Sequence, residues 1–323
     1  MSASRLAGLD GLRGVAALCI LVFHATPGLL GSFRGNAYLA VDLFFMLSGY
    51  VIARTYEARL GDGLSPAAFL TIRYRRLWPT MFIGGLMGLP WFFITFDSSH
   101  WWIAIANLLL IPTFLFNRVY VLNAPAWSIF FELVANMLHA VILRRVSTGC
   151  LIIAAIAAAS FLAFVGSRST LDIGSQPSLA IFAIFRVMLS YMIGVILWRR
   201  WKDKPPYNVP PALAFAAMPL LLGAGTLLGH DYWLTGMIYI ILVCPLMIAG
   251  GLRLSGVQPF ARLIGDMSFP LYAFHANIFL SVELAGLNVP WGIALSLAAA
   301  YLFTRLERKA AGRQLPASIA API

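Results

Sequence analysis

The feature that most limits what this chain can fold into is a succession of long apolar segments separated by short polar loops. A helix that spans a bilayer needs about 20 mainly apolar residues, because an unpaired backbone polar group in hydrocarbon costs several kcal/mol. The pattern therefore predicts an all-α, polytopic membrane helix bundle. The eleven segments cover residues 13–31, 37–54, 77–95, 101–116, 127–143, 149–166, 179–198, 211–229, 234–250, 268–286 and 290–305.

The composition agrees with lipid as the solvent of this chain. Hydrophobic residues make up 61% of its 323 residues and charged residues only 11%, whereas soluble domains average about 45–50% and about 25%. A soluble domain, a disordered chain and a fibrous repeat are thereby excluded. Because no long polar insert and no fixed-period repeat interrupts the segments, we expect one membrane domain over 1–323 with a short cytoplasmic tail over 306–323.

The positions of the basic residues predict which loops face the cytoplasm. The formal net charge is +11, and in a membrane protein such an excess marks the inner side rather than a nucleic-acid partner. The first apolar segment is expected to stay as a helix rather than act as a cleavable signal, since further spans follow it. Most Lys and Arg residues lie at the N-terminus and in 54–76, 144–145, 199–204, 253–262 and 305–313.

This assignment leaves one apolar segment that does not cross the membrane. The number of crossings between the inner loops 54–76 and 144–145 must be even, yet three segments lie there. The shortest, 101–116, carries Pro112 near its end, and a re-entrant piece is tolerated where protein or water covers its backbone. We therefore expect ten crossings, one short re-entrant or interfacial segment, and both termini in the cytoplasm.

Ionisable side chains inside the spans mark the candidate functional site, because they are costly there and usually functional. In a hairpin joined near residue 33, positions i and 66 − i lie at equal depth, which puts His24 level with Asp42. A carboxylate beside an imidazole fixes its tautomer and raises its basicity; alternatively, the pair only joins two helices. The span residues concerned are His24, Asp42, Glu132, His139, Arg186, His275 and Glu283.

Three of these residues allow more than one interpretation. Glu132 lies at a depth similar to that of His24 if its segment enters from outside, or else it is an interfacial carboxylate near water. Arg186 needs a buried counter-charge, which Glu132 or Asp42 could supply. His275 follows Tyr272 on the same helix face and is either a core histidine or a catalytic one.

The remaining polar groups of the spans indicate no further chemistry. We expect Glu283 to be solvated near an outer helix end and His139 to lie at an interface or in a loop. The three cysteines lie in apolar stretches without metal or disulfide spacing. The sequence contains no phosphate-binding loop, no dinucleotide fingerprint, no nucleophile elbow and no metal-ligand cluster, so we expect no metal.

A dense arginine group immediately precedes the third apolar segment. Arg73, Arg75 and Arg76 lie in the sequence RYRRLWP. Such a group at the inner face either binds lipid headgroups or binds a phosphate-rich soluble ligand, whose oxygens match the guanidinium fork. Arg73 and Arg76 share a face if the helix has already begun.

Together these motifs resemble the membrane acyltransferase 3 family, whose members O-acylate carbohydrates and other acceptors at bacterial membranes. The resemblance covers essentially the whole chain, and the chain looks like the compact acetyltransferases that act on exopolysaccharide or its lipid-linked repeat units. The matching motifs are LDGLRGVAALCILVFH with Asp10, Arg13 and His24, VDLFFMLSGYVI with Asp42, RYRRLWP with Arg73 and Arg76, WSIFFEL with Trp127, Ser128 and Glu132, Arg186 followed by Gly194, and MSFPLYAFH with Ser268, Tyr272 and His275.

The resemblance implies a multi-pass protein of the bacterial inner membrane that uses acyl-CoA, most often acetyl-CoA, as co-substrate and holds no permanent cofactor. The catalytic candidates are His24 as general base, Asp42, Glu132 and His275. Asp10 is an alternative to Asp42 as the carboxylate that orients or charge-balances His24. The donor-binding candidates are Asp10, Arg13, Arg73 and Arg76, and the acceptor-binding candidates are Trp127, Ser128, Arg186 and Tyr272.

Other classes of function stay open from sequence alone. Buried His, Asp, Glu and Arg side chains also suit a proton-coupled transporter or flippase, and a membrane scaffold is the least specific alternative. If the chain is an enzyme, the acceptor is an exopolysaccharide, a lipopolysaccharide sugar, peptidoglycan or a small glycosylated metabolite. The acyl group then passes either directly or through an acyl-histidine.

Overall fold

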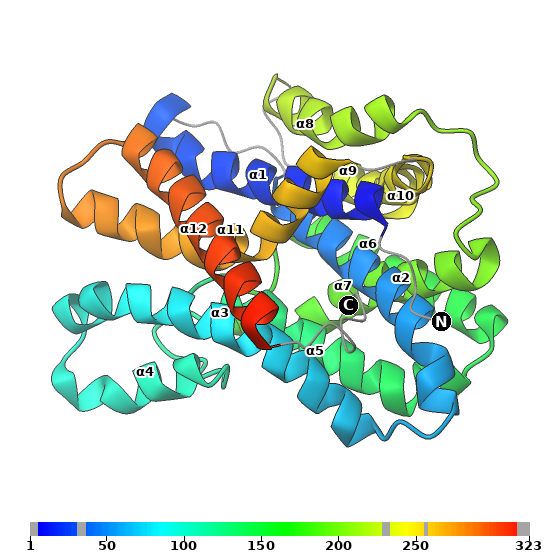
Figure 1. Cartoon of the computed structure of the whole chain (residues 1–323), viewed down its shortest axis with the longest axis horizontal. Helices are drawn as coiled ribbons and strands as arrows, with labels where there is room; N and C mark the ends of the chain where they lie inside the picture. Colours follow the sequence, from blue (N-terminus) through cyan, green and yellow to red (C-terminus); the bar gives the residue numbers. More distant parts are fainter. Residues whose placement is uncertain (1–5, 31–36, 228–232, 255–257, 315–323) are drawn as a thin grey trace.

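The computed structural model describes residues 6–30, 37–227, 233–254 and 258–314, and every regular element in those ranges is a helix (Figure 1). The predicted all-α fold is confirmed, and each of the eleven predicted segments contains a helix among its described residues. The elements are α1 (Ala7–Leu30), η1 (Ala37–Leu39), α2 (Ala40–Gly61), α3 (Pro66–Thr95), η2 (Ser98–His100), α4 (Trp101–Leu108), α5 (Ala126–Val141), η3 (Leu143–Arg145), α6 (Thr148–Arg168), α7 (Pro177–Trp201), α8 (Pro211–Leu227), α9 (Trp233–Ile238), η4 (Tyr239–Val243), α10 (Cys244–Leu252), α11 (Pro259–Leu284) and α12 (Val289–Gln314).

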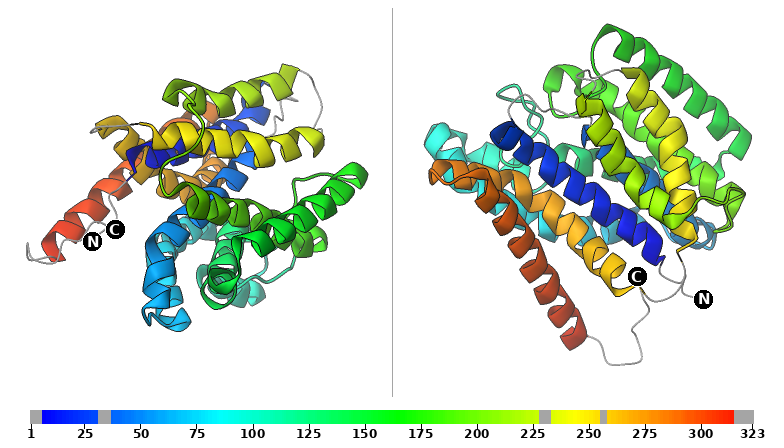
Figure 2. Two further views of the ribbon diagram at one scale, coloured as in Figure 1. Left: turned by 90° about the vertical axis from the view of Figure 1, so that its right-hand side faces the viewer. Right: turned by 90° about the horizontal axis from the view of Figure 1, so that it is seen from above.

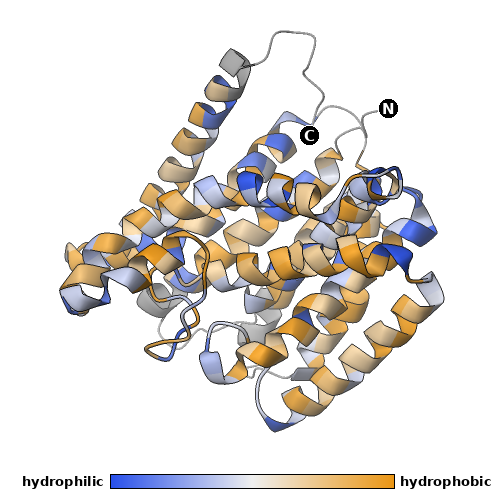
Figure 3. Ribbon diagram, turned by 90° about the horizontal axis from the view of Figure 1, so that it is seen from below, coloured by the Kyte–Doolittle hydropathy of each residue, from blue (hydrophilic) through white to orange (hydrophobic). Residues whose placement is uncertain are grey.

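The helices have the length and apolarity of a multi-pass membrane protein. Seven of them, among the described residues, could each cross a bilayer, and hydrophobic residues recur along most of the helices (Figure 3). Outward-facing side chains such as Ile153 and Ile156 of α6 are largely exposed, as expected where lipid is the neighbour. Of the predicted tail 306–323, residues 306–314 continue α12 and the rest lies outside the described residues.

The segment predicted not to cross the membrane forms a short helix followed by an irregular loop. With eight residues, α4 is about 12 Å long, well below the roughly 30 Å of the hydrocarbon core. It packs against α3, where Trp78 Nε1 donates to the Leu108 carbonyl at 2.9 Å. The loop 109–125 then leads to α5, and Asn107 fixes it by accepting from the amides of Val121 and Leu122 at 2.8 and 3.0 Å.

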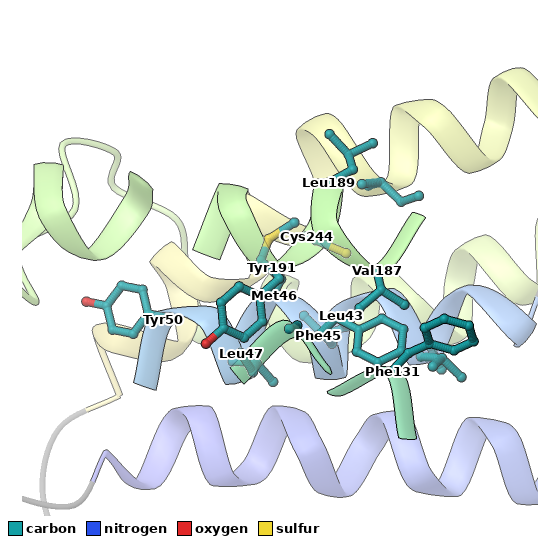
Figure 4. Close-up of a cluster of buried hydrophobic side chains, with 14 of the residues drawn as sticks. Leu43, Phe45, Met46, Leu47, Tyr50, Phe131, Val187, Leu189, Tyr191 and Cys244 are labelled. Carbon is teal, nitrogen blue, oxygen red and sulfur yellow. The ribbon is translucent and has the colours of Figure 1, made fainter. Parts of the chain in front are cut away.

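Helices that follow one another in sequence are not always the closest partners in space. The most extensive contacts of α1 are with α11, and those of α2 are with α7; Figure 2 shows α1 and α11 side by side. Figure 4 shows the apolar core between α2, α5 and α7, which includes Phe45, Met46, Phe131 and Tyr191. This lateral arrangement decides which ionisable side chains meet.

Two glycines allow α2 and α7 to approach each other closely. A β-carbon on Gly49 would overlap the Tyr191 carbonyl oxygen, and one on Gly194 would overlap the Met46 carbonyl oxygen. Between membrane helices, where burial from water does not drive association, close backbone packing of small residues supplies much of the attraction. The contact between α2 and α7 therefore depends on the absence of side chains at these positions.

The variant Gly194→Ala should force α2 and α7 apart. Overpacking of this kind costs about 1–3 kcal/mol, so the thermal unfolding midpoint of the purified protein in detergent should fall. The matched control is Gly61→Ala in α2, where a β-carbon would meet nothing within 4 Å. Equal midpoints for the two variants would contradict the close-packing account.

Candidate active site

A cavity of about 650 Å³ lies where α1, α11, the loop 109–125 and the loop between α6 and α7 meet. It is lined by four of the residues singled out from sequence, namely His24, Trp127, Tyr272 and His275. Tyr120, which also lines it, donates to the Leu110 carbonyl at 2.5 Å. Because burial raises the pKa of the Tyr120 phenol, this side chain stays neutral and is no candidate base.

His24 and His275 form a contacting pair at the cavity wall. The Nδ1 atom of His24 lies 3.0 Å from the Ile20 carbonyl oxygen and 3.3 Å from His275 Nε2. The Nδ1 atom of His275 lies 2.8 Å from the Tyr272 carbonyl oxygen. His275 is buried, whereas His24 is exposed.

These contacts define where the hydrogens of the two neutral rings lie. A carbonyl oxygen can only accept, so both Nδ1 atoms must carry a hydrogen. The single Nδ1 hydrogen of His24 is then shared between the Ile20 carbonyl oxygen and His275 Nε2, which both accept. This leaves the Nε2 atom of His24 with a free lone pair, which makes it the basic atom of the pair.

The predicted pair between His24 and Asp42 is wrong. Asp42 is fully buried and accepts from Arg186 Nη2 at 2.6 Å and from Ser190 Oγ at 3.0 Å. Equal depth in a hairpin did not bring His24 and Asp42 together, because α1 packs chiefly against α11 and α2 against α7. Of the two counter-charges considered for Arg186, Asp42 is the one that the structure shows.

Arg186 also fastens two backbone segments at the cavity. Its Nη1 donates to the carbonyls of Leu171 and Ile173 at 2.9 and 3.3 Å, and its Nη2 donates to the Tyr38 carbonyl at 2.9 Å. Tyr38 and Asp172, which lies between the two bonded carbonyls, both line the cavity. Arg186 itself is buried behind the wall, so it holds the wall rather than a ligand.

Asp172 is a cavity residue that the sequence reasoning missed. It belongs to the loop between α6 and α7, outside the apolar segments, and carries no family motif. The usable signal was its position a few residues before the helix that carries a buried arginine. Its carboxylate interacts electrostatically with His24.

Glu132 lies with the arginine group rather than in the cavity lining. Its Oε1 accepts from Arg73 Nη2 at 3.0 Å and from Ser48 Oγ at 2.8 Å. Arg73 is buried, and its Nε has no partner in the part of the chain that the structure describes. Glu132, expected among the catalytic residues, therefore lies with Arg73 and outside the cavity lining.

The three arginines expected to bind the donor gather near the first half of α1. Arg76 is exposed and interacts electrostatically with Arg73 and Arg13. Asp10 Oδ1 lies 3.7 Å from Arg13 Nη1. From Arg13 to His24 the distance along α1 is roughly 16 Å at about 1.5 Å per residue.

Arg75 points elsewhere. It lines a separate surface groove together with Tyr74 and Trp78, whose rings stack 6.1 Å apart. The arginine group is thus divided between two surfaces: Arg73 and Arg76 belong with Arg13, and Arg75 belongs with the aromatic groove.

A buried contact holds one residue of the cavity wall. The hydroxyls of Ser128 and Tyr272 are 2.8 Å apart, and the Tyr272 ring lies 5.8 Å from that of Phe44. Ser128 thus holds Tyr272 in the cavity wall. The cavity lining includes none of Arg13, Arg73 and Arg76, so the arginines and the cavity are two separate places.

His139 is not the interface or loop residue that we expected. It is fully buried in α5, and its Nε2 lies 3.7 Å from Glu57 Oε1, an atom that also accepts from Arg199 Nη2 at 2.6 Å. Glu283 is exposed, as predicted. Among the residues described, no group of three or more His, Cys, Asp or Glu side chains could hold a metal ion.

Comparison with known proteins identifies relatives over nearly the whole chain. The profile of the acyltransferase domain of the acyltransferase 3 family matches residues 6–305. The putative membrane-bound transacylase BcsY of Komagataeibacter xylinus is 24% identical, over 98% of this chain and 86% of that protein. The exopolysaccharide production protein ExoZ of Rhizobium meliloti (strain 1021) is 24% identical, over 87% of this chain and 89% of that protein.

A third relative is more similar but over a shorter stretch. Protein 2 in the picA locus of Rhizobium radiobacter is 37% identical, over 41% of this chain and 79% of that protein. No solved structure matches the chain.

The variant Arg186→Lys should destabilise the protein although it keeps the positive charge. A lysine cannot bond Asp42 and three backbone carbonyls at once, and buried acceptors left unpaired next to a buried charge should lower the free energy of unfolding by about 2–4 kcal/mol. Thermal unfolding in detergent measures this loss. The control is Arg200→Lys, at an exposed position of the same helix; equal midpoints would contradict the bracing role of Arg186.

Proposed function

Because the chain belongs to the membrane acyltransferase 3 family, we propose that it is an O-acyltransferase that moves an acetyl group from acetyl-CoA to a hydroxyl of a carbohydrate. The acceptor in this proposal is an exopolysaccharide or a lipid-linked sugar. The names of its relatives, a membrane-bound transacylase and an exopolysaccharide production protein, support this substrate class. The observation that carries the proposal is the contact of His24 with His275 at a cavity, in which His24 Nε2 is the basic atom of the inferred tautomer.

The proposed topology has ten crossings of the bacterial inner membrane with both termini in the cytoplasm. To the seven apolar helices it adds α2, α8 and α11, of which α2 and α11 carry ionisable side chains. The short α4 does not cross. With this topology the arginine group lies at the cytoplasmic face, and the cavity lies in the outer half.

Arg13, Arg73 and Arg76 form the proposed site for the nucleotide end of the donor. Coenzyme A is a cytosolic polyanion, and guanidinium groups match phosphate oxygens bidentately. Arg76 is exposed there, and the unpartnered Nε of Arg73 can donate to an oxygen of the donor. The pantetheine arm then runs along α1 past Tyr272 and Ser128, which must separate for the thioester to reach His24.

In the proposed reaction His24 acts as general base. Its Nε2 takes the proton of the acceptor hydroxyl while the oxygen attacks the thioester carbonyl, so that the new C–O bond forms and the C–S bond breaks. The proton then passes to the departing sulfur of coenzyme A. His275 is a positioning residue, because its Nε2 accepts the Nδ1 hydrogen of His24 and keeps the opposite nitrogen basic. A positioned general base contributes about 10²–10⁴ in rate.

The variant His24→Ala should lower acetyl transfer by about 10²–10⁴ while the protein still inserts and folds. Transfer is measured with labelled acetyl-CoA and candidate glycans. His275→Ala should lower acetyl transfer by a smaller factor, since it removes only the hydrogen-bond acceptor that orients His24. The control is His100→Ala, in η2 and outside the cavity lining.

Near-normal transfer by His24→Ala would instead assign the base to His275. If the unsubstituted protein moves a glycan in a proton-dependent manner without labelling it, the protein is a transporter and not an acyltransferase.

The variant Arg76→Ala should raise the KM for acetyl-CoA about 10- to 100-fold, since a charged hydrogen bond is worth about 1.5–3 kcal/mol, and should leave the KM for the acceptor unchanged. The matched control is Arg75→Ala, which removes the same charge one residue away, at the aromatic groove. An effect of Arg75→Ala equal to that of Arg76→Ala would indicate a general attraction to anionic lipid rather than a donor site.

A further inference from the structure

The loop between α6 and α7 holds one carboxylate firmly at the cavity wall. Leu171 and Ile173 are 1% exposed, whereas Asp172 between them is exposed. Arg186 bonds the carbonyls of both neighbours, and the amide of Asp172 donates to Thr170 Oγ1 at 3.0 Å. A loop residue bonded on both sides to a buried, ion-paired arginine is placed as firmly as a helix residue.

A cation lies on another part of the same wall. Arg118 lines the cavity from the loop 109–125, where a bridge with Leu115 closes a short turn and the left-handed φ values of Phe116 and Asn117 tighten it. The amide of Val119 donates to the Ser175 carbonyl at 2.9 Å, which ties this loop to the loop that carries Asp172. Among the described residues that line the cavity, Asp172 is thus the negative side chain and Arg118 the positive one.

The other described residues of the lining include aromatic and amide-bearing side chains beside aliphatic ones. Tyr38 and Trp127 supply flat faces, and Asn117 and Gln176 supply amide donors and acceptors. In the described part of the wall the charges of Asp172 and Arg118 balance, which does not favour a polyanion, and the charged and amide side chains do not favour a purely apolar acyl chain. Flat rings, amides and a carboxylate suit a neutral, polyhydroxylated ring, because a carboxylate can accept from two hydroxyls at once.

We propose that Asp172 is an acceptor-binding residue, which accepts hydrogen bonds from hydroxyls of a neutral sugar ring and so presents a neighbouring hydroxyl to His24. This inference rests on the proposed function. In this proposal the buried Asp42–Arg186 pair acts on the acceptor indirectly: it holds Asp172 and Tyr38 in the cavity wall and does not touch the acceptor. The negative charge of Asp172 also stabilises the imidazolium that forms at His24 during transfer.

The test uses the full-length protein in nanodiscs, labelled acetyl-CoA, and a panel of neutral methyl glycosides as acceptor probes. For the glycoside that accepts most label, Asp172→Asn should raise the acceptor KM about 10- to 100-fold, the loss expected for a charge-assisted hydrogen bond. The KM for acetyl-CoA should not change. The control is Glu283→Gln, which removes an exposed carboxylate outside the cavity lining.

A set of monodeoxy analogues of that glycoside then separates binding from structural damage. With the unsubstituted protein, the KM of the analogue that lacks the bonded hydroxyl should be higher than that of the parent glycoside. The factor should be about the same as that by which Asp172→Asn raises the KM of the parent glycoside. With Asp172→Asn, removal of that hydroxyl should raise the KM little further, because the variant lacks the carboxylate that bonds the hydroxyl. If Asp172→Asn does not fold, Asp172→Glu provides the same comparison with a displaced carboxylate.

Three results would overturn the inference. An unchanged acceptor KM in Asp172→Asn, or additive losses from the variant and every deoxy analogue, would show that Asp172 does not bind the acceptor, while the proposed function would stand. The absence of label on every glycoside with the unsubstituted protein would contradict the proposed function itself, and this inference with it.

Discussion

The rest of the structure depends on what a charged side chain must find inside a bundle solvated by lipid. Each one needs either a counter-charge with complete hydrogen bonding or a cavity that admits water and substrate. Arg186 has the first solution, with Asp42 and three backbone carbonyls around it. Arg73 has it in part, with Glu132 on one side and an unpartnered Nε on the other. His24 has the second solution, at the wall of the cavity.

The hydropathy pattern predicted the helices. The positions of Lys and Arg predicted the helix ends near which the basic side chains lie. It could not predict lateral neighbours, because the apolar residues on either side of a membrane helix differ little and lipid replaces water as the outer neighbour. The equal depth of His24 and Asp42 in the first hairpin therefore predicted the wrong partner for His24. The close approach of α2 and α7 instead brings Asp42 to Arg186. Asp172 was not predicted for a related reason. It lies in a loop, and Arg186, which is paired with Asp42, holds that loop at the cavity.

The two ends of α1 give the molecule its proposed two-sided character. One end carries Arg13 near Arg76, and the other carries His24 at a cavity whose wall includes Asp172. In the proposed reaction the pantetheine arm passes the contact of Ser128 with Tyr272, which must open to let the thioester reach His24. The proposed chemistry therefore combines a base at the cavity with an anion site near the other end of α1.

The measurement that tests this account most directly is an experimental structure of the protein in lipid with a non-hydrolysable acetyl-CoA analogue. The account predicts phosphate density at Arg76 and Arg13, separated hydroxyls of Ser128 and Tyr272, and an acyl carbon close enough to His24 Nε2 for an acceptor hydroxyl to lie between them, each contact being roughly 3–3.5 Å. An analogue that binds with its nucleotide end beside Asp172, or that leaves its acyl carbon on the far side of an unbroken Ser128–Tyr272 contact, would contradict it.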